Sequence, residues 1–422
     1  MKRSINYAIK RGEFLGAMSL KIHKELFPIL AIATLFIDKQ IHYFTNTIAR
    51  IINFGLLNAL YYLFIYGIMV GFVILIGNKI RKKYLFYSII VLALLGVSAC
   101  FSVDARKYIT EDLSTILYAS LWSIYVCMHS DDMEQLDKIV EYSIKTAGLM
   151  MCICFPINEL VIGYNTPEKQ YMSMSYMLLT GAVGYLYYGI TKMKVVDIVI
   201  GVIQVIELCV AGARGPLLCV VAIVFISAIR LAQSTNYKAT VALVCIGILG
   251  VFIIFNLENL IYMLSQFGVN SGMDLRLINM IQSDSFFESK STNLRSQFQV
   301  YMKDFILDNP FGAGVYSDRV LGERLSIGVA YAHNILYEIL MNYGIIFGGT
   351  AILLLFFNTI RAVINSNTYN KATIDILISL VLVKLFVSSS YWLEPLFFVL
   401  IFLLYRNRRE TNMRTIKGEE II

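Results

Sequence analysis

Long apolar runs recur along almost the whole chain, and they restrict its fold more than any other feature. Many of these runs reach about 20 residues, the length that a helix needs to cross roughly 30 Å of hydrocarbon. Every backbone polar group in lipid must find its partner within the protein, so only helices or closed barrels span a bilayer. The runs therefore predict an all-α, polytopic integral membrane protein.

The composition excludes an ordinary water-exposed surface. Of the 422 residues, 58% are hydrophobic and only 15% are charged, and the mean hydropathy is +0.67. The runs predict about 12 transmembrane helices in one membrane domain, residues 1–422. These helices are expected near residues 24–37, 51–77, 84–103, 112–128, 139–157, 172–190, 194–211, 215–231, 239–256, 332–360, 373–389 and 391–405.

The positive charges indicate how the chain is oriented. Although the net charge is +7, the Lys and Arg residues stand at the ends of the apolar runs, which argues against nucleic acid as a partner. With the N-terminus inside, 22 of them lie on the inner side and 6 in the short outer loops. The first run has no small-residue cleavage site, so we expect it to remain as a span with both termini cytoplasmic.

One connection, residues 257–331, is far longer than the others and is expected on the outer side as a folded periplasmic or extracytoplasmic segment. Loops of this length usually carry function. Within it, Leu294, Phe298, Tyr301 and Phe305 recur at helical spacing after a cap signal at Ser291-Thr292-Asn293. An amphipathic helix near residues 293–307 is therefore predicted at the outer membrane surface.

Two arginines on the predicted outer side are candidates for binding an anion. Arg214 stands with Gly215 directly before Pro216, where the free N–H groups of a helix start would lie beside its guanidinium. Arg295 lies in the first turn of the loop helix, where a cation is mildly disfavoured, so its position needs another reason. The alternatives are an interfacial Arg that reaches lipid headgroups and a solvated surface charge.

His333 is the one histidine of four that stands at the outer mouth of an apolar helix, in Tyr331-Ala332-His333-Asn334. An imidazole at this place can take a proton from a sugar hydroxyl near neutral pH. The alternative is a histidine that only caps or packs.

Ionisable residues inside spans are costly and are therefore functional candidates. Glu207 precedes Arg214 by seven residues on the same helix face, and Glu338 follows His333 by five. Lys384 lies within the last apolar run but one. An ion pair of Lys384 with Glu338 or Glu207 would neutralise both partners, and we weigh this structural role above a catalytic one.

Signatures of metal, nucleotide and nucleophile sites are missing from the sequence. A sugar-nucleotide enzyme would usually need a carboxylate site for a metal ion. A lipid diphosphate donor would not, because arginines can carry the charge.

Three groups of motifs occur in order on one predicted membrane face. They are Ala213-Arg214-Gly215, Leu294-Arg295 leading to Asn309-Pro310-Phe311-Gly312-Ala313-Gly314, and Ala332-His333-Asn334 with Asn342-Tyr343-Gly344. Together with the hydropathy they resemble the bacterial O-antigen polymerase and O-antigen ligase superfamily. The segment 171–176, Tyr-Met-Ser-Met-Ser-Tyr, is also similar to a segment of surface-polysaccharide polymerases.

The resemblance implies a metal-independent glycosyltransferase without cofactor, acting on undecaprenyl-diphosphate-linked glycans at the outer face of the bacterial inner membrane. Arg214 and Arg295 would bind the donor diphosphate, with His333 orienting or deprotonating the acceptor hydroxyl. Gly215, Asn334 and Tyr337 would complete the substrate-binding set. Expected partners are the lipid-linked donor and acceptor, membrane lipid and a chain-length regulator.

Within that superfamily a polymerase extends lipid-linked chains of O-antigen or capsular type, whereas a ligase transfers the glycan to the lipid A core of lipopolysaccharide. We favour the polymerase. A flippase or other transporter would usually show internal repeats and helices broken at the midplane. A membrane scaffold would not explain why the candidate residues gather on one face.

Overall fold

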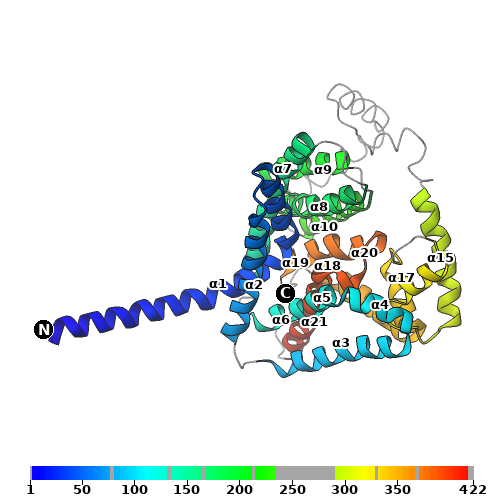
Figure 1. The fold of residues 1–422 in the computed structure, drawn as a ribbon, viewed down its shortest axis with the longest axis horizontal. Coiled ribbons are helices and arrows are strands. Elements are labelled where there is room, and N and C mark those ends of the chain that lie inside the picture. The colour runs from blue at the N-terminus through cyan, green and yellow to red at the C-terminus, as the bar shows by residue number, and fades with distance from the viewer. Residues whose placement is uncertain are drawn as a thin grey trace.

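The computed structural model describes residues 2–76, 80–130, 135–162, 168–211, 214–233, 290–327, 331–365 and 370–416. In these ranges all regular secondary structure is helical (Figure 1), which confirms the predicted all-α class. The predicted span 239–256 and residues 257–289 of the long connection lie outside the described residues.

In the N-terminal half several helices match the apolar runs, whereas α1 extends far beyond the predicted span 24–37 and the predicted span 112–128 is divided into two short helices and a π-helical turn. The first predicted span lies within the long helix α1. The helices are α1 (Lys2–Ile51), α2 (Leu56–Ile76), α3 (Lys82–Phe101), α4 (Val103–Glu111), α5 (Leu113–Leu117), α6 (Ser123–His129), α7 (Leu136–Ile162), α8 (Glu168–Thr191), α9 (Val195–Ala211) and α10 (Arg214–Gln233).

The C-terminal part holds the rest of the long connection and the last spans. Its helices are α15 (Lys290–Asp308), α16 (Ser317–Arg324), α17 (Ile335–Tyr343), α18 (Gly349–Ile364), α19 (Lys371–Leu377), α20 (Lys384–Val387) and α21 (Pro395–Ile416). Short π-helical turns at Gly344–Gly348 and Ile378–Val383 join α17 to α18 and α19 to α20.

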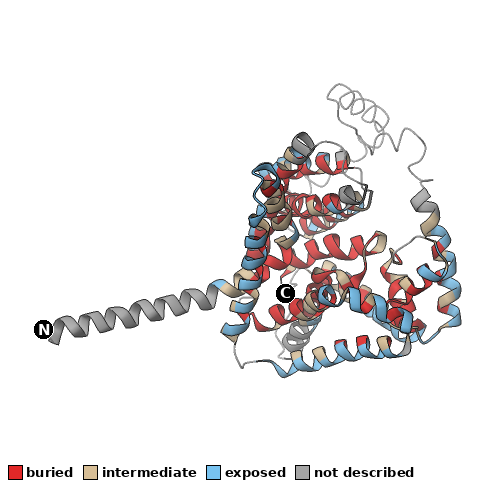
Figure 2. Ribbon diagram, viewed as in Figure 1, coloured by how far each residue is buried: buried red, intermediate tan, exposed pale blue. Residues whose placement is uncertain are grey.

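Five helical segments are long and apolar enough to cross a membrane by length and composition: Leu56–Ile76, Lys82–Cys100, Leu136–Ile157, Gly215–Gln233 and Ile335–Ile364. The chain is thus a multi-pass membrane protein, while the count of twelve spans stays a prediction. On α2 and α3 many large apolar side chains are uncovered, such as Leu63 at 70% exposure and Phe86 at 68%. Figure 2 shows α3 largely pale blue, as expected for a helix that faces lipid.

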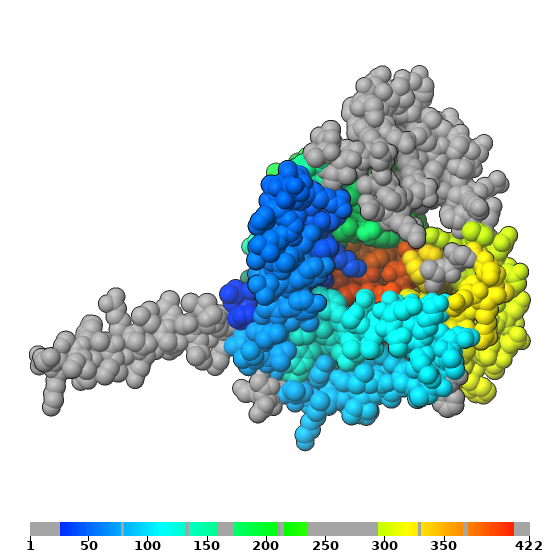
Figure 3. Space-filling view, viewed as in Figure 1, coloured from blue at the N-terminus to red at the C-terminus, as the bar shows by residue number. Residues whose placement is uncertain are grey.

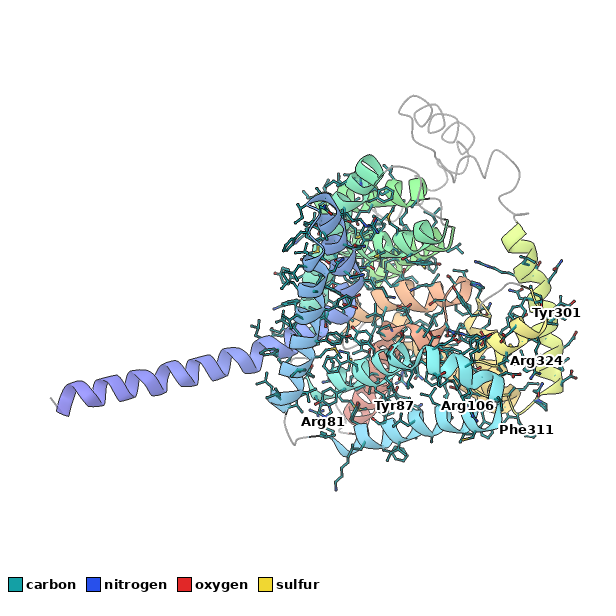
Figure 4. All side chains as sticks on the ribbon, viewed as in Figure 1. Arg81, Tyr87, Arg106, Tyr301, Phe311 and Arg324 are labelled. Atoms are coloured by element: carbon teal, nitrogen blue, oxygen red, sulfur yellow. The ribbon has the colours of Figure 1, made fainter. Side chains whose placement is uncertain are left out.

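Loops assigned to the outer face by the sequence contact each other. Helix α4, between two predicted spans, packs on α16 of the long connection, where Arg324 donates to Asp104 at 2.9 Å. Lys107 of α4 also donates to Glu323 at 3.3 Å. In Figure 4, Arg106 and Arg324 lie on one side of the molecule, whereas Arg81 lies near the opposite end of α3.

Loops assigned to the inner face also meet. The backbone N–H of Arg81 donates to Nε2 of His129 at 3.0 Å, and Thr373 N–H donates to the Asp137 carboxylate at 2.9 Å. These contacts agree with the predicted separation of the two sets of loops. Which of the two faces is cytoplasmic stays a prediction.

Candidate functional site

Helix α15 brings Arg295 to the end of α20. One face of α15 buries Phe298, Met302 and Ile306 against residues of α16 and α17. Arg295 lies one turn before Phe298 and donates from Nη1 to the backbone carbonyl of Val387 at 3.4 Å.

The predicted helix near residues 293–307 therefore exists, with two differences from the sequence prediction. It begins at Lys290, so the proposed cap residues lie inside it. Tyr301 is 47% exposed and points away from the neighbouring helices (Figure 4), so Met302 takes its expected place on the buried face.

The Asn-Pro-Phe-Gly-Ala-Gly turn after α15 packs against the Asn-Tyr-Gly break after α17. Ile345 N–H donates to the Pro310 carbonyl at 2.8 Å, and Ala313 N–H donates to the Met341 carbonyl at 2.8 Å. Gly312 has a φ of +88°, and a Cβ there would stand 2.6 Å from the Asn342 carbonyl oxygen. The two glycine-containing motifs are thus one structural unit, in which only glycine allows the close approach.

His333 has an unusual backbone conformation between two anchors. Its φ is +53°, in the left-handed region that non-glycine residues rarely occupy. On one side the N–H of Ala332 donates to the fully buried carboxylate of Asp318 at 2.8 Å. On the other side Asn334 caps α17, with its side-chain oxygen accepting from Leu336 N–H at 2.9 Å. Such strain often marks a functional position.

His333 and Arg295 lie close enough to affect each other. Burial, with the nearby Arg295 guanidinium as a second cause, lowers the pKa of His333 from 6.5 to about 3. The imidazole is therefore neutral at physiological pH. Its ring lies with its centroid 3.9 Å from that of the Tyr331 ring, at an interplanar angle of 41°, and Nδ1 is buried without a hydrogen-bond partner among the described residues.

Arg214 begins α10, but its side chain lies outside the described part of the structure, so its convergence with Arg295 and His333 stays a prediction. The position of the next residue, Gly215, is compatible with this convergence. A Cβ on Gly215 would stand 2.4 Å from the Tyr176 hydroxyl and 3.2 Å from Val387, whose carbonyl accepts from Arg295. The start of α10 thus lies beside the Arg295 contact.

Lys384 is buried with a carboxylate partner, but the partner is Glu394 and not Glu338 or Glu207. The chain turns back after α20 at Ser388, and this turn brings Glu394 beside Lys384. The predicted spans 373–389 and 391–405 already required a tight reversal near residue 390, but the pairing of Lys384 with Glu394 across it was not predicted. The predicted identity of the ion pair is therefore wrong.

The two acids assigned to Lys384 have other surroundings. Glu338 is 1% exposed and accepts hydrogen bonds from the Ser390 hydroxyl and from Tyr391 N–H. Glu207 is buried on α9, and its Oε2 has no hydrogen-bond partner among the described residues. Tyr337, expected to bind substrate, packs against the apolar cluster of α15.

A cavity of about 680 Å³ opens next to these residues. It shares Tyr176, Tyr331 and Ser388 with the surroundings of Arg295 and His333. Figure 3 shows a hollow whose floor is formed by the orange part of the chain, framed by the blue, cyan and yellow segments. In the described ranges no three His, Cys, Asp or Glu side chains group as metal ligands would.

Several residues at or near the site were missed in the sequence. Asp318 and Glu394 are acids in stretches without a recognisable pattern, and only the fold shows what they bind. The segment 171–176 was singled out without a role, and its residues Ser173, Met174 and Tyr176 line the cavity. Its similarity to a segment of surface-polysaccharide polymerases was the sequence signal that could have pointed to this position.

The fold is that of a multi-pass membrane protein, in which the candidate residues Arg295 and His333 lie close together. Residues 199–354 match the family model described as O-Antigen ligase, which confirms the resemblance to the O-antigen polymerase and ligase superfamily over a range that contains Arg214, Arg295 and His333. The match supports a membrane glycosyltransferase of polymerase or ligase type. Searches of curated proteins and of solved structures returned no significant match.

Proposed function

We propose that this chain is a polysaccharide polymerase of the bacterial inner membrane. It would transfer a growing glycan from undecaprenyl diphosphate to the non-reducing end of another lipid-linked repeat unit on the outer face. The observation that carries the proposal is the contact region of Arg295, His333 and the start of α10, which combines a fixed cation with a neutral imidazole.

The chemistry requires one C–O bond to form and one to break. An acceptor hydroxyl attacks the anomeric carbon of the donor sugar, and the bond from that carbon to the diphosphate breaks. Arg295 and Arg214 would stabilise the charge that develops on the leaving diphosphate. The acceptor proton would pass to His333, whose neutral imidazole can accept it.

Donor binding would also prepare His333 for this role. The Arg295 guanidinium contributes to the low pKa of the imidazole. A diphosphate bound to Arg295 would offset that charge and raise the pKa of His333 from its low value, although burial, the larger cause, would continue to lower it. The proton acceptor would thus become stronger only when the donor is in place.

Purified protein given only lipid-linked repeat units should produce a ladder of glycan lengths without added nucleotide or metal ion. His333→Ala should lower the rate by roughly 10²–10⁴, the usual contribution of a general base, with no loss of folded protein. Arg214→Ala should weaken use of the donor. A ladder of unchanged rate in the His333→Ala protein would contradict the assigned role.

The second candidate is an O-antigen ligase, because the matching family model carries that description. The same assay separates the two activities. If the lipid-linked units stay monomeric until a lipid A core is supplied, and each core then receives a single chain, the ligase replaces the polymerase.

A further inference from the structure

Helix α1 carries a row of polar side chains along one face of its second half. Asp38, His42, Asn46 and Arg50 are spaced four residues apart, which places them on the same side of the helix and along about 18 Å of its length. A polar row on a helix of a membrane protein is costly in contact with lipid, so it should face protein, water or a ligand.

This row faces the cavity described above. All four residues line it, together with residues of α8 between Ser173 and Thr180 and residues of the turn between Ser388 and Leu396. Because Tyr331 also lines the cavity and its ring contacts His333, a ligand held against α1 can extend to the imidazole.

Part of the polar lining is already used for structure. Asp38 accepts from the Tyr61 hydroxyl of α2, and the side-chain oxygen of Asn46 accepts from the Asn58 amide of α2 at 3.4 Å, which leaves the amide N–H groups of Asn46 for a ligand. Gln40 donates to the Thr180 hydroxyl at 2.9 Å, which ties α1 to α8. Other groups are unused: Nδ1 of His42 and the Tyr118 hydroxyl are buried without a hydrogen-bond partner in the part of the chain that is described. Buried polar groups without partners are rare in proteins and indicate water or a ligand.

The charges of the cavity argue against a second diphosphate site. Lys384 is paired with Glu394, whose other oxygen lies 3.9 Å from Nζ of Lys39, and Asp38 also lines the cavity. Lys39 and Lys384 thus share one acid, while Arg50 lies at the far end of the row on α1. What remains is a mixture of amide, hydroxyl and imidazole groups with the aromatic rings of Tyr43, Tyr118, Tyr176 and Tyr331.

Such a lining suits a carbohydrate. Sugar hydroxyls both donate and accept hydrogen bonds, as amides and imidazoles do, and the C–H faces of a sugar ring pack on aromatic rings. We propose that residues 38–50 of α1 form one wall of a saccharide-binding site, which holds the sugar units of a lipid-linked glycan beyond the diphosphate. This inference rests on the proposed function for the identity of the glycan.

Binding, measured without turnover, tests the proposal. The protein would carry His333→Ala to block transfer, and two probes would be titrated: undecaprenyl-diphosphate-linked repeat units and undecaprenyl diphosphate without sugar. His42→Ala and Asn46→Ala should each weaken binding of the glycan probe by roughly threefold to tenfold, the effect of a lost hydrogen bond. The affinity for the sugar-free lipid should stay unchanged.

Thr45→Ala is the matched control, because Thr45 lies on the same helix but does not line the cavity. His42→Gln keeps hydrogen-bonding groups at this position and should retain glycan binding. It therefore shows whether a loss in His42→Ala comes from the missing hydrogen bond or from misfolding. The proposal is overturned if the α1 variants bind the glycan as tightly as the control, or if binding of the sugar-free lipid falls equally. Selective loss of glycan binding in the α1 variants, combined with no polymer from the protein that keeps His333, would support this site and reject only the polymerase activity.

Discussion

The conformation of His333 depends on hydrogen bonds made by the residues on either side of it. The Asp318 carboxylate holds the N–H of Ala332, and the Asn334 side chain starts α17, so the positive φ at His333 is fixed from both sides. The motif Ala-His-Asn is visible in the sequence, and its cap could be predicted. The role of Asp318, fourteen residues away in another helix, could not, because no local pattern connects the two.

Asp318 should therefore act as a positioning residue. Asp318→Ala leaves the buried Ala332 N–H without an acceptor and releases the His333 turn, so we expect the turnover number to fall roughly 10²-fold, as small displacements of catalytic groups do. Asp318→Asn keeps an oxygen for that N–H and should retain most of the rate. Transfer kinetics with saturating lipid-linked units measure both variants.

Asp304→Ala provides a comparison for this test, since Asp304 is an exposed acid on α15. It should have no effect on turnover. If the Asp318→Ala protein keeps its full turnover number, or if Asp318→Asn fails as completely as Ala, the hydrogen bond to Ala332 does not position His333.

For Lys384, the sequence predicted that an ion pair exists but not which acid forms it. The cost of a buried ammonium group correctly predicted a carboxylate partner, since burial without a partner would be unfavourable. The partner was predicted to be Glu338 or Glu207, which lie in other predicted spans. Glu394 lies at the start of the next predicted span and reaches Lys384 through the reversal at residues 388–390, where Ser389 has a φ of +68°. The predicted spans indicated the reversal but not which acid it brings to Lys384.

At the scale of helices, hydropathy predicted most elements, because a spanning helix needs a long apolar run. The predicted span 215–231 corresponds to Arg214–Gln233, and 172–190 corresponds to Glu168–Thr191. The π-helical turns inside predicted spans were not foreseen. They depend on how neighbouring helices pack, since the apolar pattern continues through them.

Helices α10 and α19 are joined by a buried ion pair that we expect to be important for stability. The Arg230 guanidinium donates to both carboxylate oxygens of Asp375, at 2.7 and 2.8 Å, and to the carbonyls of Ala362 and Val363. Arg230→Ala should destabilise the protein by about 3–5 kcal/mol, because it leaves a buried carboxylate without its cation. The thermal midpoint of the purified protein in detergent measures the loss.

Two further variants show whether the buried pair is the cause. Arg230→Met combined with Asp375→Leu should recover much of the lost stability, since no charge is then left unpaired. Lys107→Ala removes an exposed pair with Glu323 and should cost only about 0–1 kcal/mol. Equal losses for Arg230→Ala and Lys107→Ala would refute the special role of the buried pair.

For the whole molecule, the arrangement of loops decides whether the candidate site can lie on the outer side of the membrane. The contacts between α4 and α16 on one face, and between Arg81 and His129 on the other, agree with the alternation of the predicted spans. Contacts alone do not state which face is cytoplasmic. That assignment comes from the excess of Lys and Arg on one side, 22 against 6, because positive loops are retained in the cytoplasm.

A phosphatase that is active only outside the cytoplasm should therefore be active when fused near Ser285, within the long connection 257–331, and silent when fused after Arg409. A reporter that works only in the cytoplasm, fused at the same two positions, should give the opposite pattern and controls for expression. The physical reason is the charge bias, which opposes translocation of the loops that contain Lys138, Lys192 and their counterparts. An active phosphatase after Arg409 with a silent one near Ser285 would place Arg295 and His333 on the cytoplasmic face. The proposed transfer between lipid-linked glycans on the outer face would then be impossible.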